Sequence, residues 1–309
     1  MTWPNGIGAG LHLTGRSRDL VTPTEGSPRI LATADLQVVT GTDRNIESIV
    51  SEPMAVGLEH LVGCKGGGNL RAAIAHEVPD EVELGTPLHL LLDDLAGSTL
   101  IAGFAFFRWA DRIPEFEEFR RKAPRRVMQG VCSGFRPGSS SLLSDGTQSG
   151  TAHRVQAVGP LSATNDPMSW HQLAPHPEIA MRRARRIDVW RDHGELSIDA
   201  MFRDSCWDPD GSEIAVHEYH LLARADGGTD ALTSVEARPR ILPYVECPLA
   251  APNAEWLIGT PMRALRSEVL ERLRGSDCCT HLNDALRSLA EVPVLASSLP
   301  GNNEPIPNT

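Results

Sequence analysis

The chain has 309 residues and a formal net charge of −11, and its 41% of hydrophobic residues suffice for a sizeable buried core. The acidic balance excludes non-specific nucleic-acid binding, which needs a basic surface. The most apolar stretch, LHLLLDDLAGSTLIAGFAFF, is interrupted by Asp93, Asp94 and two glycines, so we expect no membrane span. The N-terminus lacks the pattern of a secretion signal, and we therefore expect a cytoplasmic protein.

The first predicted unit covers residues 1–110. A strand that contains Arg18-Asp19 leads through a turn at Glu25-Gly26 into a second alternating strand, and NIESIVSEP predicts a third. Two helices follow, in NLRAAIAHEV and in the apolar stretch that contains HLLLDDL. The local order of this unit is therefore β-β-β-α-α.

An insertion over residues 111–186 follows the first unit. The segment IPEFEEFRRKAPRRVMQGV predicts a helix, and the next residues are rich in Gly and Ser, which is typical of a loop. Loops of this length in compact proteins are commonly functional or disordered. The insertion ends with the run MRRARR, which indicates either a solvated face or a set of arginines that grips an anionic ligand.

The second predicted unit, residues 187–298, repeats the order of the first. Arg203-Asp204 matches Arg18-Asp19 and Asp210-Gly211 matches Glu25-Gly26, both at an offset of 185 residues. A third strand and helices over about 253–274 and 280–291 complete the unit, and residues 299–309 form a flexible tail. We interpret the chain as an α+β protein built by tandem duplication, with antiparallel sheets covered by helices on one face.

Candidate site residues gather in the second unit. The positions of the first unit that match Cys279 and His281 fall near Leu88 and Leu90, and the position that matches His217 is Ala32. Residues required by packing are expected in both units, whereas residues required by chemistry can occur in one. The first unit is therefore expected to be a degenerate structural partner.

A zinc site is the first chemical hypothesis. Cys247 follows the third strand, Cys279 stands at the start of the last helix, and His281 lies two residues further on. Two thiolates and an imidazole are typical zinc ligands. Asp204 or His217 is expected to complete the set or to act as general base. The alternative is that the cysteines are inert buried thiols, since the spacing lacks a C-x-x-C pair.

A second candidate set lies in the insertion. GVCSGF contains Cys132 and NDPMSWHQL contains His171, which could form a nucleophile and base if the fold brings them together. The alternative is a loop capped by a buried Trp. The residues expected to bind an anionic substrate are Arg182, Arg183, Arg186 and Tyr244.

Two resemblances add to this interpretation. The chain resembles a bacterial protein family known mainly as a domain of unknown function, through segments such as GVCSGF, DPMSWH, RRARRIDVW, LPYVECPLA and CCTHLNDALRSLAEVPVL. The order strand, strand, strand, Cys, helix, Cys-led helix is more loosely similar to iron–sulphur cluster scaffold and sulphur-acceptor proteins. Cys247 and Cys279 match that order, whereas the first-loop cysteine of those proteins has no counterpart.

The functional expectation is a metal- or thiol-dependent enzyme, a hydrolase or lyase, acting on a small anionic organic molecule with zinc as cofactor. The alternative is a non-enzymatic carrier of an iron–sulphur cluster or of sulphur, or an accessory protein that binds an enzyme. A homo-oligomer is compatible with either interpretation.

Overall fold

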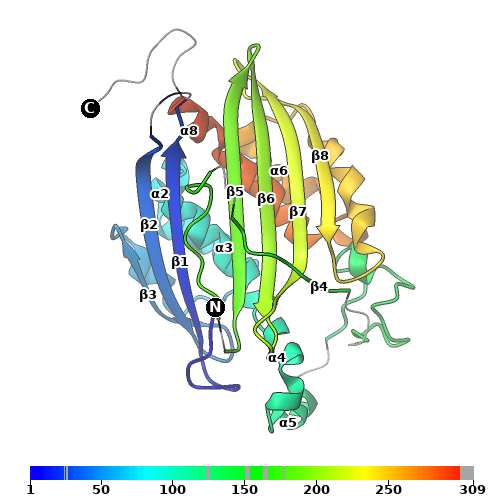
Figure 1. The fold of residues 1–309 in the computed structure, drawn as a ribbon. Coiled ribbons are helices and arrows are strands. Elements are labelled where there is room, and N and C mark those ends of the chain that lie inside the picture. Colours follow the sequence, from blue (N-terminus) through cyan, green and yellow to red (C-terminus); the bar gives the residue numbers. More distant parts are fainter. Residues whose placement is uncertain are drawn as a thin grey trace.

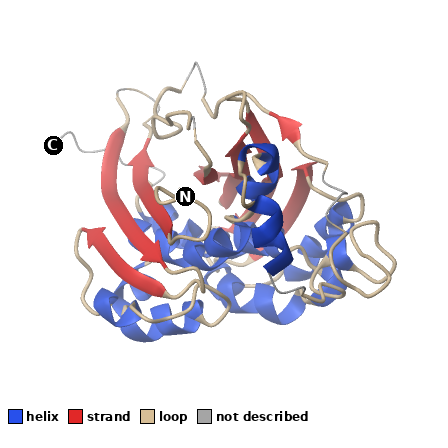
Figure 2. Ribbon diagram, turned by 90° about the horizontal axis from the view of Figure 1, so that it is seen from below, coloured by secondary structure: helices blue, strands red, loops and turns tan. Residues whose placement is uncertain are grey.

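The computed structural model of the chain describes residues 1–23, 25, 27–122, 126–149, 154–162, 166–176 and 178–299. Two antiparallel sheets stand side by side, and most of the helices form a layer on one side of both (Figures 1 and 2). The predicted α+β class with antiparallel sheets is therefore confirmed. The predicted tail lies almost wholly outside the described residues.

The first sheet has the order β1-β2-β3, with β1 at Leu11–Val21, β2 at Arg29–Thr40 and β3 at Ile46–Glu52. In β2, the buried residues Ala34, Leu36 and Val38 alternate with exposed neighbours. This period of two places one face of the sheet against the helices, because successive side chains of a strand point to opposite faces.

The second sheet contains one long strand more than expected. Its long strands run β5-β6-β7-β8, and the short β4 pairs with the start of β7. The strand bounds are Gln156–Ala157 for β4, Met181–Asp192 for β5, Glu195–Trp207 for β6, Glu213–Asp226 for β7 and Leu232–Ile241 for β8. The run MRRARR, placed in the insertion by the sequence, opens β5, which pairs along its whole length with β6.

The helical layer is made mostly of short helices, and α3, with 15 residues, is the longest α-helix of the described residues (Figure 1). Its α-helices are α1 Leu70–Glu77, α2 Pro79–Leu84, α3 Pro87–Ile101, α6 Leu265–Arg272, α7 Thr280–Ser288 and α8 Val292–Ser297. The 3-10 segments η4, Cys247–Leu257, and η7, Leu289–Glu291, extend it. By length and composition alone the helical stretch Pro87–Arg108 could cross a membrane, but 56% of its most apolar part is buried in the protein, as in a core helix.

Two short helices follow α3: α4 at Phe104–Arg108 ends the first predicted unit, and α5 at Phe116–Lys122 lies in the insertion. Within the described residues, the helix predicted over IPEFEEFRRKAPRRVMQGV is thus shorter than expected, because α5 begins at Phe116 and residues 126–131 are not helical. Arg108 anchors α4 to the second sheet by two hydrogen bonds, of 2.7 and 2.6 Å, to the carboxylate of Asp208.

The segment after the third strand has matching hydrogen bonds in both parts of the chain. The N–H of Ile46 donates to the carbonyl of Cys64 at 2.9 Å, and Gly63 donates back to Ile46 at 2.8 Å. Leu232 donates to Thr260 at 2.9 Å, and Gly259 donates back to Leu232 at 2.8 Å. Both glycines have a positive φ, 85° for Gly63 and 86° for Gly259, a conformation that favours glycine.

Candidate functional site

Three polar residues converge where α7 begins above β6 and β7. Asp204 of β6 pairs in register with His217 of β7, but Ser205 pairs with Ala215, so Val216 is the extra residue of a β-bulge. A bulge re-aims the side chains beside it. The ring of His217 stacks on that of His281 in α7, with ring centres 3.4 Å apart and an angle of 13° between the planes.

The carboxylate of Asp204 is the centre of this group and is fully buried. Arg183 of β5 donates two hydrogen bonds to it, of 2.8 and 3.0 Å. The same carboxylate has one oxygen 3.7 Å from Nε2 of His281 and 3.9 Å from Nδ1 of His217. Arg183 therefore fixes the orientation in which Asp204 faces both imidazoles.

The imidazole of His281 is held in its neutral form. Burial, followed by the positive charge of Arg183, lowers the pKa of His281 to about 3. Neutral imidazole is the form that binds metal ions. The side chain of His281 is 18% exposed, so the group has contact with solvent at this residue while Asp204 has none.

Asp204, His217 and His281 form the candidate metal centre. Each offers one ligand atom, and the three atoms lie within 4.8 Å of one another. One carboxylate and two imidazoles suit zinc or another first-row divalent ion. Arg183 would then be the outer partner that orients the carboxylate ligand. Among the described residues, Cys247 and Cys279, expected as ligands, do not belong to this group.

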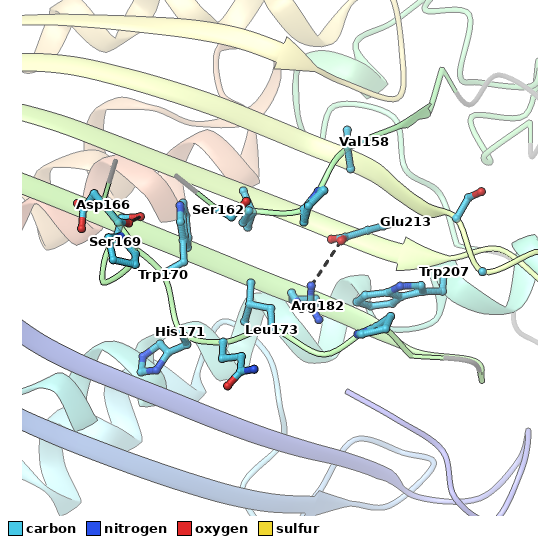
Figure 3. Close-up of a pocket in the computed structure, with 17 residues that line it drawn as sticks. Val158, Ser162, Asp166, Ser169, Trp170, His171, Leu173, Arg182, Trp207 and Glu213 are labelled. Atoms are coloured by element: carbon cyan, nitrogen blue, oxygen red, sulfur yellow. Dashed lines mark hydrogen bonds and ion pairs between the residues drawn. The ribbon is translucent and has the colours of Figure 1, made fainter. Parts of the chain in front are cut away.

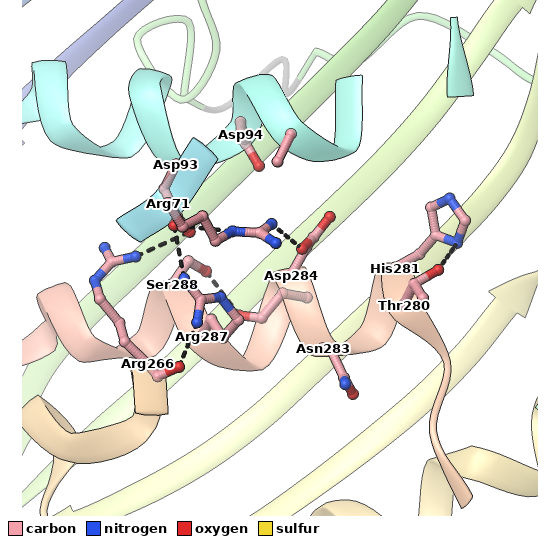
Figure 4. Close-up of polar contacts among 12 residues, drawn as sticks. Arg71, Asp93, Asp94, Arg266, Thr280, His281, Asn283, Asp284, Arg287 and Ser288 are labelled. Atoms are coloured by element: carbon pink, nitrogen blue, oxygen red, sulfur yellow. Dashed lines mark hydrogen bonds and ion pairs between the residues drawn. The ribbon is translucent and has the colours of Figure 1, made fainter. Parts of the chain in front are cut away.

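A buried network of arginines and carboxylates continues from the metal centre across the helical layer (Figure 4). It contains five guanidinium groups and five carboxylates: Arg71, Arg183, Arg185, Arg266 and Arg287 with Asp93, Asp94, Asp204, Asp284 and Glu291. Its charges balance, as buried charges require. Burial opposes ionisation of Asp93, but the charges of Arg266, Arg287 and Arg71 outweigh it and hold the pKa of Asp93 well below its usual range.

Close packing of two helices makes this network possible. Arg183 donates to Asp284 of α7 at 2.8 Å directly beside Gly97 of α3. A Cβ atom at Gly97 would overlap both the guanidinium and the carboxylate. Glycine at this position therefore leaves the space that the ion pair occupies.

Four thiols form a second group beside the metal centre. Cys279 is the N-cap residue of α7, Cys247 opens η4, and Cys132 and Cys278 are linked through a 2.7 Å hydrogen bond from the N–H of Ser133 to the carbonyl of Cys278. A Cβ at Gly134 would lie 2.7 Å from Sγ of Cys247 and 3.8 Å from Sγ of Cys132. Cys132 of the insertion thus lies close to Cys247 of the second unit.

These thiols are protonated at neutral pH. Burial, and then the neighbouring Cys279, raises the pKa of Cys132 to about 11. Burial, followed by the charges of Cys132 and Cys279, raises the pKa of Cys278 to about 12. None of the four has the lowered pKa that activates a nucleophilic cysteine.

The structure separates the other pair proposed from sequence. Cys132 lies with the thiol group, whereas His171 lies near Arg18 and Arg16 of β1, whose charges add to burial in lowering its pKa. Tyr244 is likewise away from the arginines. It packs on Phe135, with ring centres 5.4 Å apart, and its hydroxyl accepts a 2.7 Å hydrogen bond from Gln148.

The arginines of β5 divide between the network and a groove. Arg183 is buried among Asp204, Asp284 and Asp94, so its charge is fully paired. Arg182 and Arg186 lie outside this network: Arg182, whose side chain is 12% exposed, packs 4.5 Å above the Trp207 ring, and the side chain of Arg186 is 31% exposed. Side-chain alternation along a strand explains why neighbouring arginines have different roles.

The inter-sheet groove is the space between β1 and β5, above α3, and has a volume of about 590 Å³. Residues 166–176, here called the strap, run over it. Arg18 of β1 donates to the carbonyls of Met168 and Trp170 at 2.5 and 2.9 Å, and Arg182 of β5 donates to the carbonyl of Ala174. The strap is therefore fastened to both sheets.

A second cavity, of about 790 Å³, lies between the strap and the β6–β7 hairpin (Figure 3). Trp170, His171 and Arg182 contribute to both spaces, and Trp207 and Glu213 line this one. Arg182 pairs with Glu213 at 3.5 Å across it.

Sequence reasoning missed two residues of the inter-sheet groove. The sequence relates Arg18 and Asp19 to Arg203 and Asp204 by their matching positions, and it predicts no site role for either. Burial, and then the charge of Glu291, raises the pKa of Asp19 to about 6. Asp204, the residue matched to Asp19, pairs instead with Arg183 of β5. This difference in surroundings comes from the fold, and the matching Arg-Asp pairs in the sequence do not show it.

Residues 181–295 match the model of a family described as "Protein of unknown function (DUF2889)". The predicted resemblance to a family known as a domain of unknown function is thus confirmed for this segment, which holds the three residues of the candidate metal centre. No curated protein and no solved structure matches the chain. The likeness to iron–sulphur scaffolds stays a prediction.

Proposed function

We propose that the protein is a metal-dependent enzyme, a hydrolase or lyase, that acts on a small anionic organic molecule. The observation that supports this most is the group of Asp204, His217 and His281, whose ligand atoms lie within 4.8 Å of one another in a largely buried position. An ion held there would supply Lewis-acid chemistry of the kind such enzymes use. Zinc is the proposed ion, because it accepts nitrogen and oxygen ligands in closed and open sites.

The protein residues have distinct proposed roles. His217 and His281 bind the ion, and Asp204 either completes the ligand set or accepts a proton. Arg183 holds the Asp204 carboxylate in place through its two hydrogen bonds, of 2.8 and 3.0 Å. Arg182 and Arg186, on the same strand as Arg183, are the residues proposed to attract the anionic group of the substrate.

Elemental analysis of protein purified without chelator tests the proposal. We expect about one zinc per chain, lost in His217→Gln and in His281→Gln. His220→Gln is the matched control, because His220 is on the same strand and lies 2.8 Å from a carboxylate, that of Asp199. Native protein without metal, or equal metal in all three variants, would overturn the ligand assignment.

The thiol group supports a second candidate function, a carrier of an iron–sulphur cluster or of sulphur. Cys247 and Cys279 match the resemblance, and Cys132 offers the further thiol that the second unit lacks. In this function the sequence-predicted ligands Cys247 and Cys279 would bind iron instead of zinc. Iron with acid-labile sulphide in the native protein, both lost in Cys132→Ser, would favour the carrier, and zinc without sulphide would exclude it.

We also propose that the chain is a tandem duplication whose first unit has lost its site. The matching hydrogen bonds that follow the third strand of each unit support this proposal. The ion pairs support it too. Arg71 and Asp93 of the first unit correspond to Arg266 and Asp284 of the second. Arg71 pairs with both aspartates, and Arg266 pairs with Asp93, so the four residues belong to one network. Metal lost in second-unit variants and retained in Asp19→Asn would agree with a site in the second unit alone.

A further inference from the structure

The inter-sheet groove is lined by both apolar and charged side chains. Leu13 of β1, Leu91 and Leu95 of α3 and Met181 of β5 contribute to it, and Trp170 of the strap lies over it. Its volume of about 590 Å³ is within the range of roughly 300–1,000 Å³ that is typical of small-molecule sites. The groove is therefore large enough for a small organic molecule with an apolar body.

One cation of the groove lacks a counter-charge. Arg18 donates only to two carbonyl oxygens, and among the described residues no carboxylate lies within ion-pair distance of its guanidinium. The neighbouring arginines are paired, Arg186 with Asp188 and Arg16 with Asp35. Arg18 is half-buried under the strap, where a charge-assisted hydrogen bond is stronger than at an open surface.

The geometry points to an amphipathic carboxylic acid as the ligand of the inter-sheet groove. We infer that its carboxylate pairs with Arg18 and that its apolar chain lies along the groove against Leu91, beneath Trp170. Arg18 then exchanges part of its contact with the strap carbonyls for an ionised partner. This inference does not rest on the proposed function, because Arg183 and Asp94 line the groove whereas Asp204, His217 and His281 do not.

Calorimetric titration with octanoate tests the inference, with octanamide and octylamine as the uncharged and cationic probes of equal length. We expect octanoate to bind at least about tenfold more tightly than either control. Arg18→Gln should weaken octanoate binding about tenfold or more, whereas Arg16→Gln should change it less than about twofold, because Arg16 is largely exposed and already paired. Equal binding of the three probes, or tighter binding of the amine, would overturn the inference.

A second measurement locates the ligand if Arg18→Gln loosens the strap. Octanoate should change the tryptophan fluorescence of the native protein, and Trp170→Phe should remove most of that change at octanoate concentrations that saturate the variant in calorimetry. A full fluorescence response in Trp170→Phe would place the ligand elsewhere. Unchanged octanoate binding in His281→Gln would keep the groove separate from the metal proposal, so that either can fail alone.

Discussion

Gly97 of α3 provides the sharpest test of how the buried network is packed. A methyl group at this position would overlap Nη1 of Arg183 and Oδ2 of Asp284, which are joined by a 2.8 Å hydrogen bond. By helix propensity alone, Gly97→Ala would stabilise the protein by about 1 kcal/mol. The two effects have opposite signs, so the result discriminates between them.

The packing effect is expected to be the larger. Removing one interaction of a buried ion pair typically costs about 3–5 kcal/mol, because a charge then lacks its partner in a dry environment. Arg183 keeps its two hydrogen bonds to Asp204 in the variant, which favours the lower part of that range. After subtraction of the helix term from the lower part of that range, we expect Gly97→Ala to lower the free energy of unfolding by about 2–3 kcal/mol.

Equilibrium unfolding in urea measures this change. An m value equal to that of the native protein would show that the variant exposes the same amount of surface on unfolding. Gly103→Ala is the matched control. Gly103 lies six residues further along, has an α-helical φ of −64°, and has no atom within 4 Å of an added Cβ. We expect this control to be neutral or slightly stabilising. Gly97→Ala with native stability or more would refute the packing of the network described above.

Three further predictions concern titration. The pKa of Asp19, raised to about 6 by burial and then by Glu291, makes folding take up a proton, so stability falls as pH rises from about 4 to 6. Asp19→Asn should therefore gain about 1–2 kcal/mol at pH 8 and nothing at pH 4 in urea unfolding; an equal effect at both would contradict it. The pKa of His281, lowered to about 3 by burial and then by Arg183, predicts the opposite: stability is lost as pH falls from about 6.5 toward 3. In the metal-free state, His281→Gln should lose less stability than the native protein as the pH falls from about 6.5 toward 3. Equal losses of unfolding free energy in the two proteins would argue against a buried neutral imidazole. The pKa of Cys132, raised to about 11 by burial and then by Cys279, predicts alkylation at pH 7.5 about 100-fold slower than in the unfolded chain, followed by mass spectrometry; equal rates would show an accessible thiolate.

The last long helix shows what the sequence could predict. Leu282, Leu286 and Leu289 recur at helical spacing, and the predicted helix over 280–291 corresponds to α7 and the following turn, with all three leucines buried. Such periodicity depends only on the segment itself and its need to bury one face. The sequence also predicts that Asp204 and His217 lie on neighbouring strands, because the turn at Asp210-Gly211 joins the two segments that contain them.

The role of MRRARR could not be predicted in this way. Arg183 and Arg185 are buried in β5 because Asp94 and Asp284, far away in the sequence, neutralise them. A strand with charged residues on its buried face has no hydrophobic alternation, and so resembles a solvated run. The bulge at Val216, which sets the direction of His217, is also a property of strand pairing and leaves no signal in the residues themselves.

The buried network has a consequence for the order in which the chain can fold. Asp93 pairs with Arg266 and Arg287, and Arg71 pairs with Asp284. Asp93 and Arg71 are synthesised early, whereas these three partners lie in the last fifth of the chain. While the first part emerges from the ribosome, it carries ionised groups whose counter-ions have not yet been synthesised. We therefore expect its helical layer to stay loosely packed until translation is nearly finished. A fragment that ends before residue 265 should remain expanded, and it should become compact when the separately made C-terminal fragment is added.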